Sequence, residues 1–550
     1  MYGMMMNVPL TISSILEHAE NFNHDAEIVS RKPEGGIHRY IYRDAARRSR
    51  KLANALKQLG VNFQDRVATL AWNTHRHYEL YYAVSGSGAI IHTINPRLFP
   101  DQIVYIINHA EDIVLFVDLT FVPLIEKIFP KLTTLQHVVV MVGKEHLPES
   151  ALPLIAYEDL IEAHADDFEW PQIDENLAAA ICYTSGTTGN PKGVLYSHRS
   201  TVLHAMSVCG AGVLGLSSQT SVLPVVPMFH VNAWGIPYAA TMAGSKLVLP
   251  AGGLDGKSIF EMVTEDKVDL MLGVPTVWLN LLQYCEREGL KMDSVDRVVI
   301  GGSAVPRSMI KAFQEKHDAF VIQGWGMTEM SPCGSTNSPS RFTDNLPLEE
   351  RYDLQVKAGH ALYGVQMRIA GPDGATLPND GRSAGRLLVR GPWVASGYYK
   401  ETEQSAWHEG WFDTGDVGTI NEQGFLTIVD RAKDIIKSGG EWISSVDVEN
   451  HAMGHPAIAE CAVVGLPHPQ WAERPLLVVV LKEGASVAKD DILAFLSERV
   501  AKWWLPDDVL FVKELPHTAT GKVLKRQLRL EHHDLYQTAE ALAGGTSAAG

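Results

Sequence analysis

Residues 177–196 read LAAAICYTSGTTGNPKGVLY, which is an apolar run, a loop rich in glycine and hydroxyl groups, and a second apolar run. This order predicts two strands joined by the loop 184–193. Four hydroxyl side chains, three glycines and no carboxylate lie in those ten residues. Exposed N–H and O–H donors without a competing anion suit the binding of a polyphosphate. A plain surface hairpin is the alternative, but such hairpins are usually shorter.

Other glycine-rich stretches do not give the familiar nucleotide motifs. In the main loop, Gly186 and Gly189 are too close for a Walker A motif, and no Gly-Lys-Ser/Thr follows. The stretch AGGLDGKS at 251–258 has alanine where that motif needs its first glycine. The stretch GAGVLG at 210–215 follows a predicted helix, whereas a dinucleotide site needs a preceding strand. We therefore expect a loop at 210–215.

The segments on either side of the loop alternate between helix and strand. Before it we expect helices at 45–59 and 101–109 and strands at 66–71 and 113–117; after it we expect strands at 221–223, 246–249, 270–273, 297–300 and 320–322. Alternation of this kind predicts an α/β fold with helix-covered sheets. After Gly334 short segments broken by Gly and Pro predict a β subdomain. A small α+β domain follows at 432–540, including a helix at 489–501, and residues 541–550 are predicted to be disordered.

Composition narrows the function classes. The 550-residue chain carries 47 Lys and Arg against 64 Asp and Glu, a formal charge of −17. An acidic chain without basic runs is a poor partner for nucleic acid. The five cysteines are odd in number and form no CxxC, the N-terminus lacks the order of a signal peptide, and the apolar runs are too short to span a bilayer. A cytoplasmic location is the expectation.

Further motifs follow the loop in a fixed order. They are VVPMFHVNAWG (225–235), GGSAVP (301–306), QGWGMTE (323–329), GWFDTGD (410–416), DRAKDIIKSGGEWIS (430–444) and TATGKVLKR (518–526). With TSGTTGNPKGV, this series resembles the adenylate-forming enzymes, which include acyl-CoA synthetases, luciferases and peptide-synthetase domains. The last two motifs and HVNAW look most like bacterial medium- and long-chain fatty-acyl-CoA synthetases. The resemblance implies an adenylation domain at 1–431 and a mobile lid at 432–540.

The resemblance also implies a nucleotide site. Its ATP- and AMP-binding residues would be Thr184, Ser185, Gly186, Thr187, Thr188, Gly189, Lys192, Gly302, Gln323, Gly324, Trp325, Thr328, Asp416, Arg431 and Lys433. Trp325 offers a flat face for adenine, and a carboxylate such as Asp416 can accept hydrogen bonds from both ribose hydroxyls. Thr184 and Glu329 are expected to bind Mg²⁺, a hard cation that prefers oxygen ligands.

Chemistry explains the expected catalytic groups, Lys522, Lys437 and Glu329. A carboxylate must attack the α-phosphate of ATP, so the enzyme must neutralise charge and align the two anions. The resemblance assigns Lys522 to this first step, which releases pyrophosphate and leaves acyl-AMP. Lys433 lies at the expected hinge, and rotation would present Lys437, Gly439, Gly440 and Trp442 for thioester formation with CoA.

The acid is expected to lie beside His230, Val231 and Trp234, which the resemblance makes the acyl gate. In the peptide-synthetase domains that the chain resembles, an aspartate in this region usually pairs with the substrate ammonium. None lies between Thr220 and Ala251, which argues against amino-acid activation. The leading interpretation is a ligase for medium- to long-chain fatty acids. An aryl, cinnamyl or short methylthio acid is the alternative, and a non-catalytic acyl- or nucleotide-binding regulator is the alternative of another class. A homodimer is expected from the resemblance.

Overall fold

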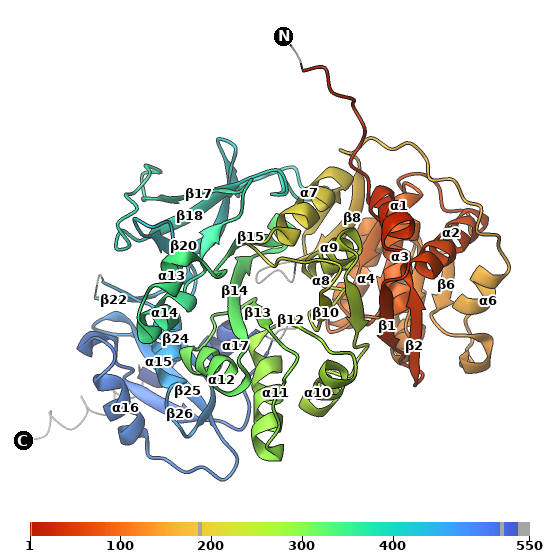
Figure 1. Ribbon diagram of the computed structural model, residues 1–550. Helices are drawn as coiled ribbons and strands as arrows, with labels where there is room; N and C mark the ends of the chain where they lie inside the picture. The colour runs from red at the N-terminus through yellow and green to blue at the C-terminus, as the bar shows by residue number, and fades with distance from the viewer. Residues whose placement is uncertain (2, 185–189, 440, 518–521, 537–550) are drawn as a thin grey trace, which may run out of the picture.

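The computed structural model describes residues 1, 3–184, 190–439, 441–517 and 522–536. The predicted site residues at 185–189, Gly440 and the tail predicted to be disordered lie outside these ranges. Figure 1 shows two α/β units side by side, followed by a β unit and a small C-terminal unit at one end of the molecule.

The first α/β unit is built on a seven-stranded sheet of order β7-β6-β5-β3-β4-β8-β9. All neighbours are parallel except β8 and β9, whose antiparallel register pairs Tyr183 with Gly193. The predicted strand–loop–strand is therefore confirmed. The strands are β3 (Arg66–Leu70), β4 (Ile90–Thr93), β5 (Asp112–Val117), β6 (His137–Val140), β7 (Leu154–Ala156), β8 (Ala178–Tyr183) and β9 (Gly193–Ser197).

The second α/β unit has a nine-stranded sheet of order β16-β15-β14-β13-β12-β10-β11-β1-β2. The strands from β14 to β1 in this order are parallel. At one edge β2 is antiparallel to β1, and at the other β15 is antiparallel to both β14 and β16. The strands are β1 (Glu27–Arg31), β2 (Ile37–Ile41), β10 (Ser221–Pro224), β11 (Lys246–Leu249), β12 (Leu270–Gly273), β13 (Arg297–Gly301), β14 (Phe320–Gly326), β15 (Cys333–Thr336) and β16 (His360–Ala361).

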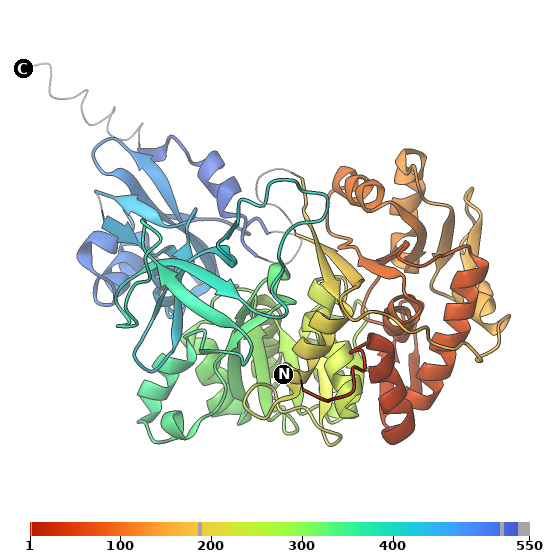
Figure 2. The same cartoon turned by 90° about the horizontal axis from the view of Figure 1, so that it is seen from above.

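Helices cover both faces of each sheet, because alternate residues of the parallel strands enter different cores. Val67 of β3 and Leu270 of β12 join the core between the sheets, whereas Ala68 and Met271 face the outer helices. Figures 1 and 2 show the resulting layers. The helices are α1 (Ile12–Phe22), α2 (Tyr42–Gln58), α3 (His75–Gly86), α4 (Pro100–Ala110), α5 (Val122–Ile128), α6 (Tyr157–Glu162), α7 (His198–Cys209), α8 (Val231–Trp234), α9 (Ile236–Ala243), α10 (Gly256–Glu265), α11 (Pro275–Glu288), α12 (Arg307–His317), α13 (Arg341–Asp344) and α14 (Leu348–Gln355).

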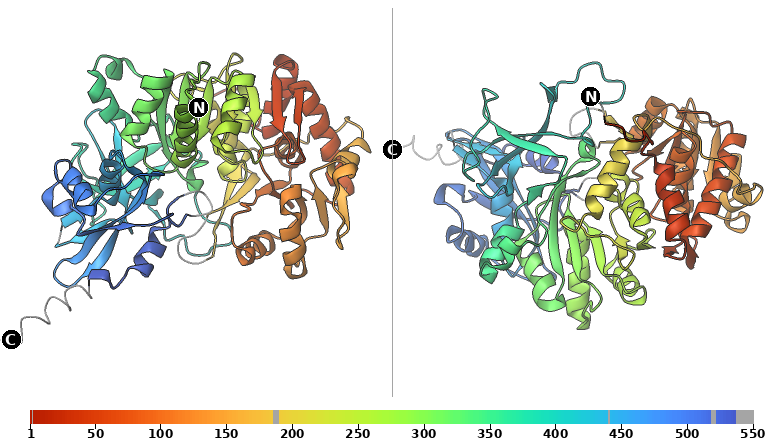
Figure 3. Two further views of the ribbon diagram at one scale, coloured as in Figure 1. Left: turned by 90° about the horizontal axis from the view of Figure 1, so that it is seen from below. Right: turned by 45° about the horizontal axis from the view of Figure 1, so that its top comes forward.

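Two small sheets complete the described chain. The β unit contains β17 (Gln366–Ala370), β18 (Gly385–Arg390), β19 (Trp407–His408), β20 (Trp411–Ile420) and β21 (Leu426–Arg431). The C-terminal unit contains β22 (Ile436–Ser438), β23 (Glu441–Ile443), α15 (Ser445–Ala452), β24 (Ile458–His468), β25 (Ala472–Leu481), α16 (Lys489–Ser497), β26 (Asp508–Phe511) and α17 (Lys525–Glu531). Figure 3 shows this unit, in blue, at the far end of the molecule from the first sheet.

The predicted α/β class, the β subdomain and the smaller α+β unit are confirmed. The helix expected at 489–501 is shorter than predicted, because α16 ends at Ser497 and the chain turns before a short 3₁₀ segment at Lys502–Trp504. The domain boundary after residue 431 falls between β21 and β22 and stays a prediction. Within the described ranges, no helix combines the length and apolar character needed to cross a membrane.

Candidate active site

The candidate site lies at the carboxyl ends of β13 and β14, where the glycine-rich motifs leave the second sheet. In α/β sheets this edge is the usual place for a ligand. Gly302 has φ +84, a conformation open to glycine, and turns the chain away from the end of β13. A Cβ on Gly301 would lie 2.9 Å from the carbonyl oxygen of Gly324 and 3.1 Å from the Trp234 ring. The two strand ends and Trp234 are therefore packed as closely as glycine permits.

Trp325 and Asp416 meet at this edge, although 91 residues separate them. The indole N–H of Trp325 donates to Asp416 Oδ2 over 2.8 Å, and Arg431 Nε lies 2.8 Å from Asp416 Oδ1. Asp416 is only 3% exposed. Burial raises the pKa of its carboxyl group, while Arg431 and the Trp325 hydrogen bond oppose that shift. A paired carboxylate is thus held beside a flat aromatic face.

Gln323 supplies a second polar group on β14, the strand that also carries Trp325. Its side chain is buried, and its Oε1 atom has no hydrogen-bond partner among the described residues. A buried acceptor without a partner is costly. It would be satisfied by an amino group on a ligand that lies against Gly324 and Trp325.

Glu329 is held by a tyrosine from the β unit. The Tyr398 hydroxyl donates to Glu329 Oε1 over 2.7 Å, and Lys192 Nζ lies 4.9 Å from the centre of the Tyr398 ring. Glu329 is 9% exposed. Desolvation of the Tyr398 hydroxyl and the nearby Glu329 charge raise the Tyr398 pKa, so the phenol stays a donor. Tyr398 therefore links a cation at one end of the glycine-rich loop to the carboxylate.

Two hydrogen bonds fix the base of the loop 184–193. Thr184 N donates to the carbonyl of Lys192 over 2.9 Å, and the Tyr196 hydroxyl donates to the carbonyl of Thr328 over 2.6 Å. These bonds bring the strands that carry the loop beside the QGWGMTE segment. The loop residues 185–189 are outside the described part of the chain.

The charges of Arg431, Asp416 and Glu329 act on the ammonium group of Lys522. The residue is exposed overall, but desolvation of its ammonium group and repulsion by Arg431 lower its pKa to about 8, against the attraction of Asp416 and Glu329. Lys433, which is exposed, also has a lowered pKa, mainly through desolvation. The structure thus places Lys522 near Asp416, Arg431 and Glu329.

The other predicted lid residues lie elsewhere. Lys437 is in β22, and its N–H donates to Glu473 Oε2; Gly439 N–H donates to the carbonyl of Trp471. Trp442, in β23, is 44% exposed. Figure 1 shows β22 at the outer edge of the C-terminal unit. Lys522, by contrast, is close enough to Asp416 and Glu329 for their charges to affect its pKa. The structure therefore presents the Lys522 face of this unit to the site, and not the β22–β23 hairpin.

The segment expected at the acyl gate has an unusual backbone. Val231, Asn232, Ala233 and Trp234 have φ between +46 and +56, and Gly235 follows at +75. For L-residues a left-handed turn costs about 1–2 kcal/mol per residue. Such a turn persists only where its surroundings hold it. Here Asn73 accepts from Met228 N and donates to the carbonyls of Pro224 and Val226 just before it.

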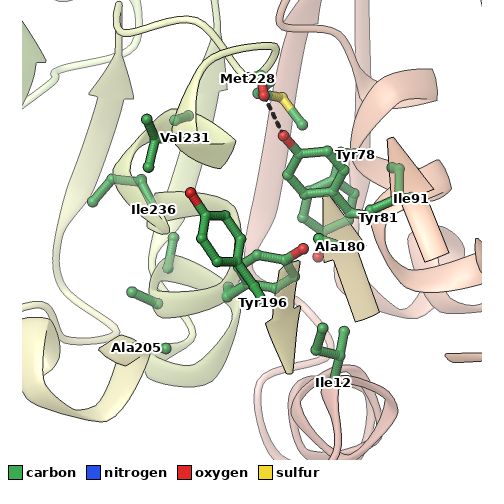
Figure 4. Close-up of a cluster of buried hydrophobic side chains, with 14 of the residues drawn as sticks. Ile12, Tyr78, Tyr81, Ile91, Ala180, Tyr196, Ala205, Met228, Val231 and Ile236 are labelled. Atoms are coloured by element: carbon green, nitrogen blue, oxygen red, sulfur yellow. Dashed lines mark hydrogen bonds between the residues drawn. The ribbon is translucent and has the colours of Figure 1, made fainter. Parts of the chain in front are cut away.

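Apolar and tyrosine side chains enclose this segment. Figure 4 shows the Tyr81 hydroxyl bonded to the Met228 carbonyl, with Val231 and Ile236 on the other side of the same buried cluster. Tyr78 and Tyr196 belong to this cluster as well. Burial, with a smaller contribution from Lys522, lowers the pKa of His230 to about 4, so this imidazole is neutral at pH 7. Residues 222–235 contain no Asp, Glu, Lys or Arg. This wall offers no fixed charge to a ligand.

Comparisons with known proteins show the family to which this chain belongs. The profile of the AMP-binding enzyme family matches residues 16–399, and that of the AMP-binding enzyme C-terminal domain matches residues 447–522. The chain belongs to the AMP-binding enzyme family. It is thus an adenylate-forming enzyme, an AMP-forming acid–thiol ligase, as the motifs predicted.

Relatives of this AMP-binding enzyme match over nearly their full length. A 3-methylmercaptopropionyl-CoA ligase of Ruegeria lacuscaerulensis is 50% identical, covering 97% of this chain and 99% of its own. A medium-chain-fatty-acid–CoA ligase of Ectopseudomonas oleovorans is 48% identical, with coverage of 97% and 98%. The crystal structure of the anthranilate CoA ligase AuaEII in complex with anthranoyl-AMP is 26% identical, with a TM-score of 0.85 and coverage of 96% and 98%.

The acidic side chains of this AMP-binding enzyme limit the way in which a metal ion could bind. The described residues hold no group of three or more His, Cys, Asp or Glu side chains placed to bind a metal ion. Glu329 is a single, largely buried carboxylate. Mg²⁺ commonly binds through one or two carboxylates together with substrate phosphates. The residues present therefore fit a Mg²⁺ ion that arrives with a nucleotide, and not a preformed protein cage.

Sequence reasoning missed two residues of the site. Tyr398 orients Glu329 from 69 residues away, and Asn232 sits buried at the centre of the left-handed turn. Asparagine tolerates positive φ better than most residues, which was the available signal for Asn232. No local pattern marks Tyr398, because its contact is set by the packing of the β unit against β14.

Proposed function

We propose that this enzyme is a ligase that joins CoA to unbranched aliphatic acids of medium chain length, extending to longer chains, through an acyl-adenylate. The observation that carries the proposal is the uncharged, apolar wall at 222–235, next to the nucleotide edge of the second sheet. A substrate ammonium or a second carboxylate would have no fixed counter-charge on this wall, and desolvating it there would be costly.

In the proposed first step, ATP lies with adenine against Trp325, its amino group near Gln323 Oε1, and its ribose hydroxyls on Asp416. The loop 184–193 holds the phosphates. Lys522 places its ammonium between the acid carboxylate and the α-phosphate, where negative charge develops. Thr184 and Glu329 would hold Mg²⁺, which neutralises phosphate charge when bound. The carboxylate oxygen attacks the α-phosphorus, and pyrophosphate leaves.

In the proposed second step, the C-terminal unit turns about Lys433. Lys522 then leaves the site, and the segment with Lys437, Gly439, Gly440 and Trp442 approaches it. The CoA thiol attacks the acyl carbonyl, loses its proton, and AMP departs with the bonding electrons. The outward position of β22 supports a large rotation, because this segment lies away from the nucleotide residues in the described orientation.

Trp234 is proposed to control entry of the alkyl chain. Its ring lies against the end of β13, as the 3.1 Å approach to a Cβ on Gly301 shows, so it sits between the nucleotide edge and the apolar wall. His230 and Val231 would line the same opening. Because His230 is neutral at pH 7, it can lie beside an alkyl chain without the cost of a buried charge.

A second candidate substrate is 3-(methylthio)propionate, a shorter acid. The 50% sequence identity to the Ruegeria lacuscaerulensis ligase favours it. A methylthio group is unbranched and apolar, so it could pack against the apolar segment 222–235 in the same way as a short alkyl chain. The two candidates differ in length, and the depth of the acyl site separates them. A cinnamate or other aryl acid needs a wider site.

The experiment is steady-state CoA-thioester formation with straight-chain acids from butyrate to palmitate, 3-(methylthio)propionate and cinnamate. Each buried CH₂ contributes about 0.8 kcal/mol, so kcat/KM should climb by about threefold to fourfold per carbon until the site is full. A profile that peaks with 3-(methylthio)propionate and falls beyond pentanoate would replace the fatty-acid assignment. A flat profile with cinnamate as the best substrate would favour the aryl alternative.

Two wider expectations accompany this proposal. A homodimer in the cytoplasm is proposed, and sedimentation velocity of the purified chain measures the first part. The alternative of a non-catalytic regulator predicts nucleotide binding without pyrophosphate release for every acid of the panel.

A further inference from the structure

Asp430 is a buried carboxylate that joins the β unit to the C-terminal unit. It lies near the end of β21, and the residue is 1% exposed. Its Oδ2 atom accepts from the backbone N–H of Ser445 over 2.8 Å and from the Ser445 hydroxyl over 2.5 Å. Its Oδ1 atom accepts from the backbone N–H of Arg431 over 2.7 Å. The carboxylate is therefore bonded on both sides of the expected hinge at Lys433.

Ser445 begins helix α15, and its contact with Asp430 satisfies the start of that helix. The first N–H groups of a helix have no partner within it, and a carboxylate placed there also interacts favourably with the helix dipole. The preceding residue, Ser444, accepts from Asp447 N over 3.1 Å, and its hydroxyl donates to the carbonyl of Val429 over 2.6 Å. Two consecutive serines thus bind the start of α15 to two consecutive residues of β21.

The same contact continues to the segment that carries Lys522. Lys525, on that segment, donates to the Ser445 hydroxyl oxygen over 2.6 Å, and its ammonium lies 2.7 Å from Glu449 Oε1. Burial acts to lower the pKa of Lys525, but the charges of Glu449 and Asp430 outweigh burial and raise it, so the ammonium is charged at pH 7. The Ser445 hydroxyl therefore bridges a cation of the C-terminal unit and a carboxylate of the β unit.

This connection crosses the expected hinge. Asp430 precedes Lys433 in the chain, whereas Ser445 follows it. A rotation of the C-terminal unit about Lys433 would separate Asp430 from Ser445 and break their hydrogen bonds. The bonds therefore belong to the orientation in which Lys522 is near Asp416.

We propose that Asp430 and Ser445 are positioning residues for Lys522, and that their hydrogen bonds hold the lysine segment against the nucleotide edge during adenylation. This inference rests on the proposed role of Lys522 and adds the residues that set its place. Neither residue needs to touch ATP or the acid. Loss of the bonds should displace the ammonium from the α-phosphate and slow adenylation. Thioester formation should be spared, because that step uses the other orientation.

Two variants remove the contact with little change in volume. Ser445→Ala removes the hydroxyl that bonds to Asp430 and Lys525, and Asp430→Asn removes the charge but keeps the shape. Ser49→Ala is the matched control, because Ser49 is a fully buried serine whose hydroxyl donates to the carbonyl of Ala45 within α2. Thermal unfolding identifies any variant that has lost its fold. If Ser445→Ala has lost it, Asp430→Asn provides the test.

The two half-reactions are measured separately, by pyrophosphate release with the best acid of the panel and by thioester formation from its supplied acyl-AMP. We expect Ser445→Ala and Asp430→Asn to lower the maximal rate of pyrophosphate release about tenfold or more, because hydrogen bonds to charged groups are strong. The KM for ATP and the rate of thioester formation should change less than threefold. Ser49→Ala should keep the wild-type values.

The pH profile gives a readout that general damage would not change. If Lys522 is displaced from its desolvated place near Arg431, its pKa should return toward its ordinary value. The fall of adenylation at alkaline pH should then move to higher pH in Ser445→Ala. An alkaline limb at the wild-type pH, in a variant that has lost adenylation, would contradict a displacement of Lys522.

A double variant separates positioning from an independent effect. If Ser445 acts through Lys522, Ser445→Ala should add less than twofold to the loss already caused by Lys522→Ala. If the two losses multiply, Ser445 acts independently and the inference is overturned. Equal losses in both half-reactions, or wild-type adenylation in Ser445→Ala and Asp430→Asn, also overturn it. The acid panel of the wild-type enzyme and Lys522→Ala alone test the proposed function, so its failure is recognised separately.

Discussion

The indole nitrogen of Trp325 donates a 2.8 Å hydrogen bond to Asp416, whose other carboxylate oxygen pairs with Arg431. The proposed adenine platform and the proposed ribose partner are therefore one unit. Because Asp416 is buried, each of its two partners offsets part of the cost of keeping the carboxylate charged. Binding of the base and binding of the sugar should respond together when this unit is changed.

Trp325→Phe keeps an aromatic face but removes the N–H donor. Hydrogen bonds to charged groups contribute about 1.5–3 kcal/mol, so we expect the KM for ATP to rise about tenfold or more, with a smaller change in the KM for the acid. Trp411→Phe is the control, since Trp411 lies on the same strand β20 and stacks between Arg368 and Arg390. Initial rates at varied ATP measure both. Equal KM values for the two variants would contradict the shared unit.

Separate measurements of the two half-reactions distinguish the proposed roles of Lys522 and Lys437, which lie on different faces of the C-terminal unit. Lys522→Ala should lower acid-dependent pyrophosphate release by about 10²- to 10³-fold, the usual effect of removing one preorganised donor from a developing charge. It should spare thioester formation from supplied acyl-AMP. Lys437→Ala should show the reverse pattern, because Lys437 lies on the outward β22. If Lys522→Ala is impaired equally in both half-reactions, its assigned role is wrong.

Much of this site could be predicted from local sequence, and the reasons differ between its parts. Gly302, Gln323 and Trp325 stand at ends of parallel strands whose apolar runs are evident, so their meeting follows from the α/β rule. The left-handed turn could not be predicted in that way. Val231 is β-branched and disfavours positive φ, and the turn depends on side chains from the other sheet.

The orientation of the C-terminal unit is also beyond local sequence. The motifs around Lys437 and Lys522 are equally evident in the chain, yet the structure brings only Lys522 to Asp416 and Glu329. Which face approaches depends on the few backbone angles near Lys433, where small changes give large displacements. The contact between Tyr398 and Glu329 is missed for a related reason, because it depends on the packing of one unit against another.

The lowered pKa of Lys522, about 8, predicts a pH dependence. The protonated ammonium is the form that stabilises negative charge, and it is present below the pKa and lost as pH rises through it. We therefore expect kcat/KM for adenylation to be level below pH 8 and to fall above it. Lys522→Arg should remove this fall, since a guanidinium stays charged, even if its maximal rate is lower. Pyrophosphate release from pH 6 to 10 measures both profiles; a wild-type profile level to pH 10 contradicts the assignment.

Tyr398→Phe tests the support given to Glu329. The substitution removes the 2.7 Å hydrogen bond to the carboxylate but keeps the ring that faces Lys192 at 4.9 Å. A carboxylate released from this bond should bind a cation less well, so we expect the Mg²⁺ concentration for half-maximal adenylation to rise about tenfold, in line with about 1.5–3 kcal/mol for a hydrogen bond to a charged group. The neighbouring Tyr399→Phe is the matched control, because the backbone bond from Tyr399 N to Gly193 is unaffected. Magnesium titrations of pyrophosphate release at saturating ATP compare the two. If Tyr398→Phe leaves the half-maximal concentration at the wild-type value, Glu329 needs no support from the β unit, and its place in the metal site loses this argument.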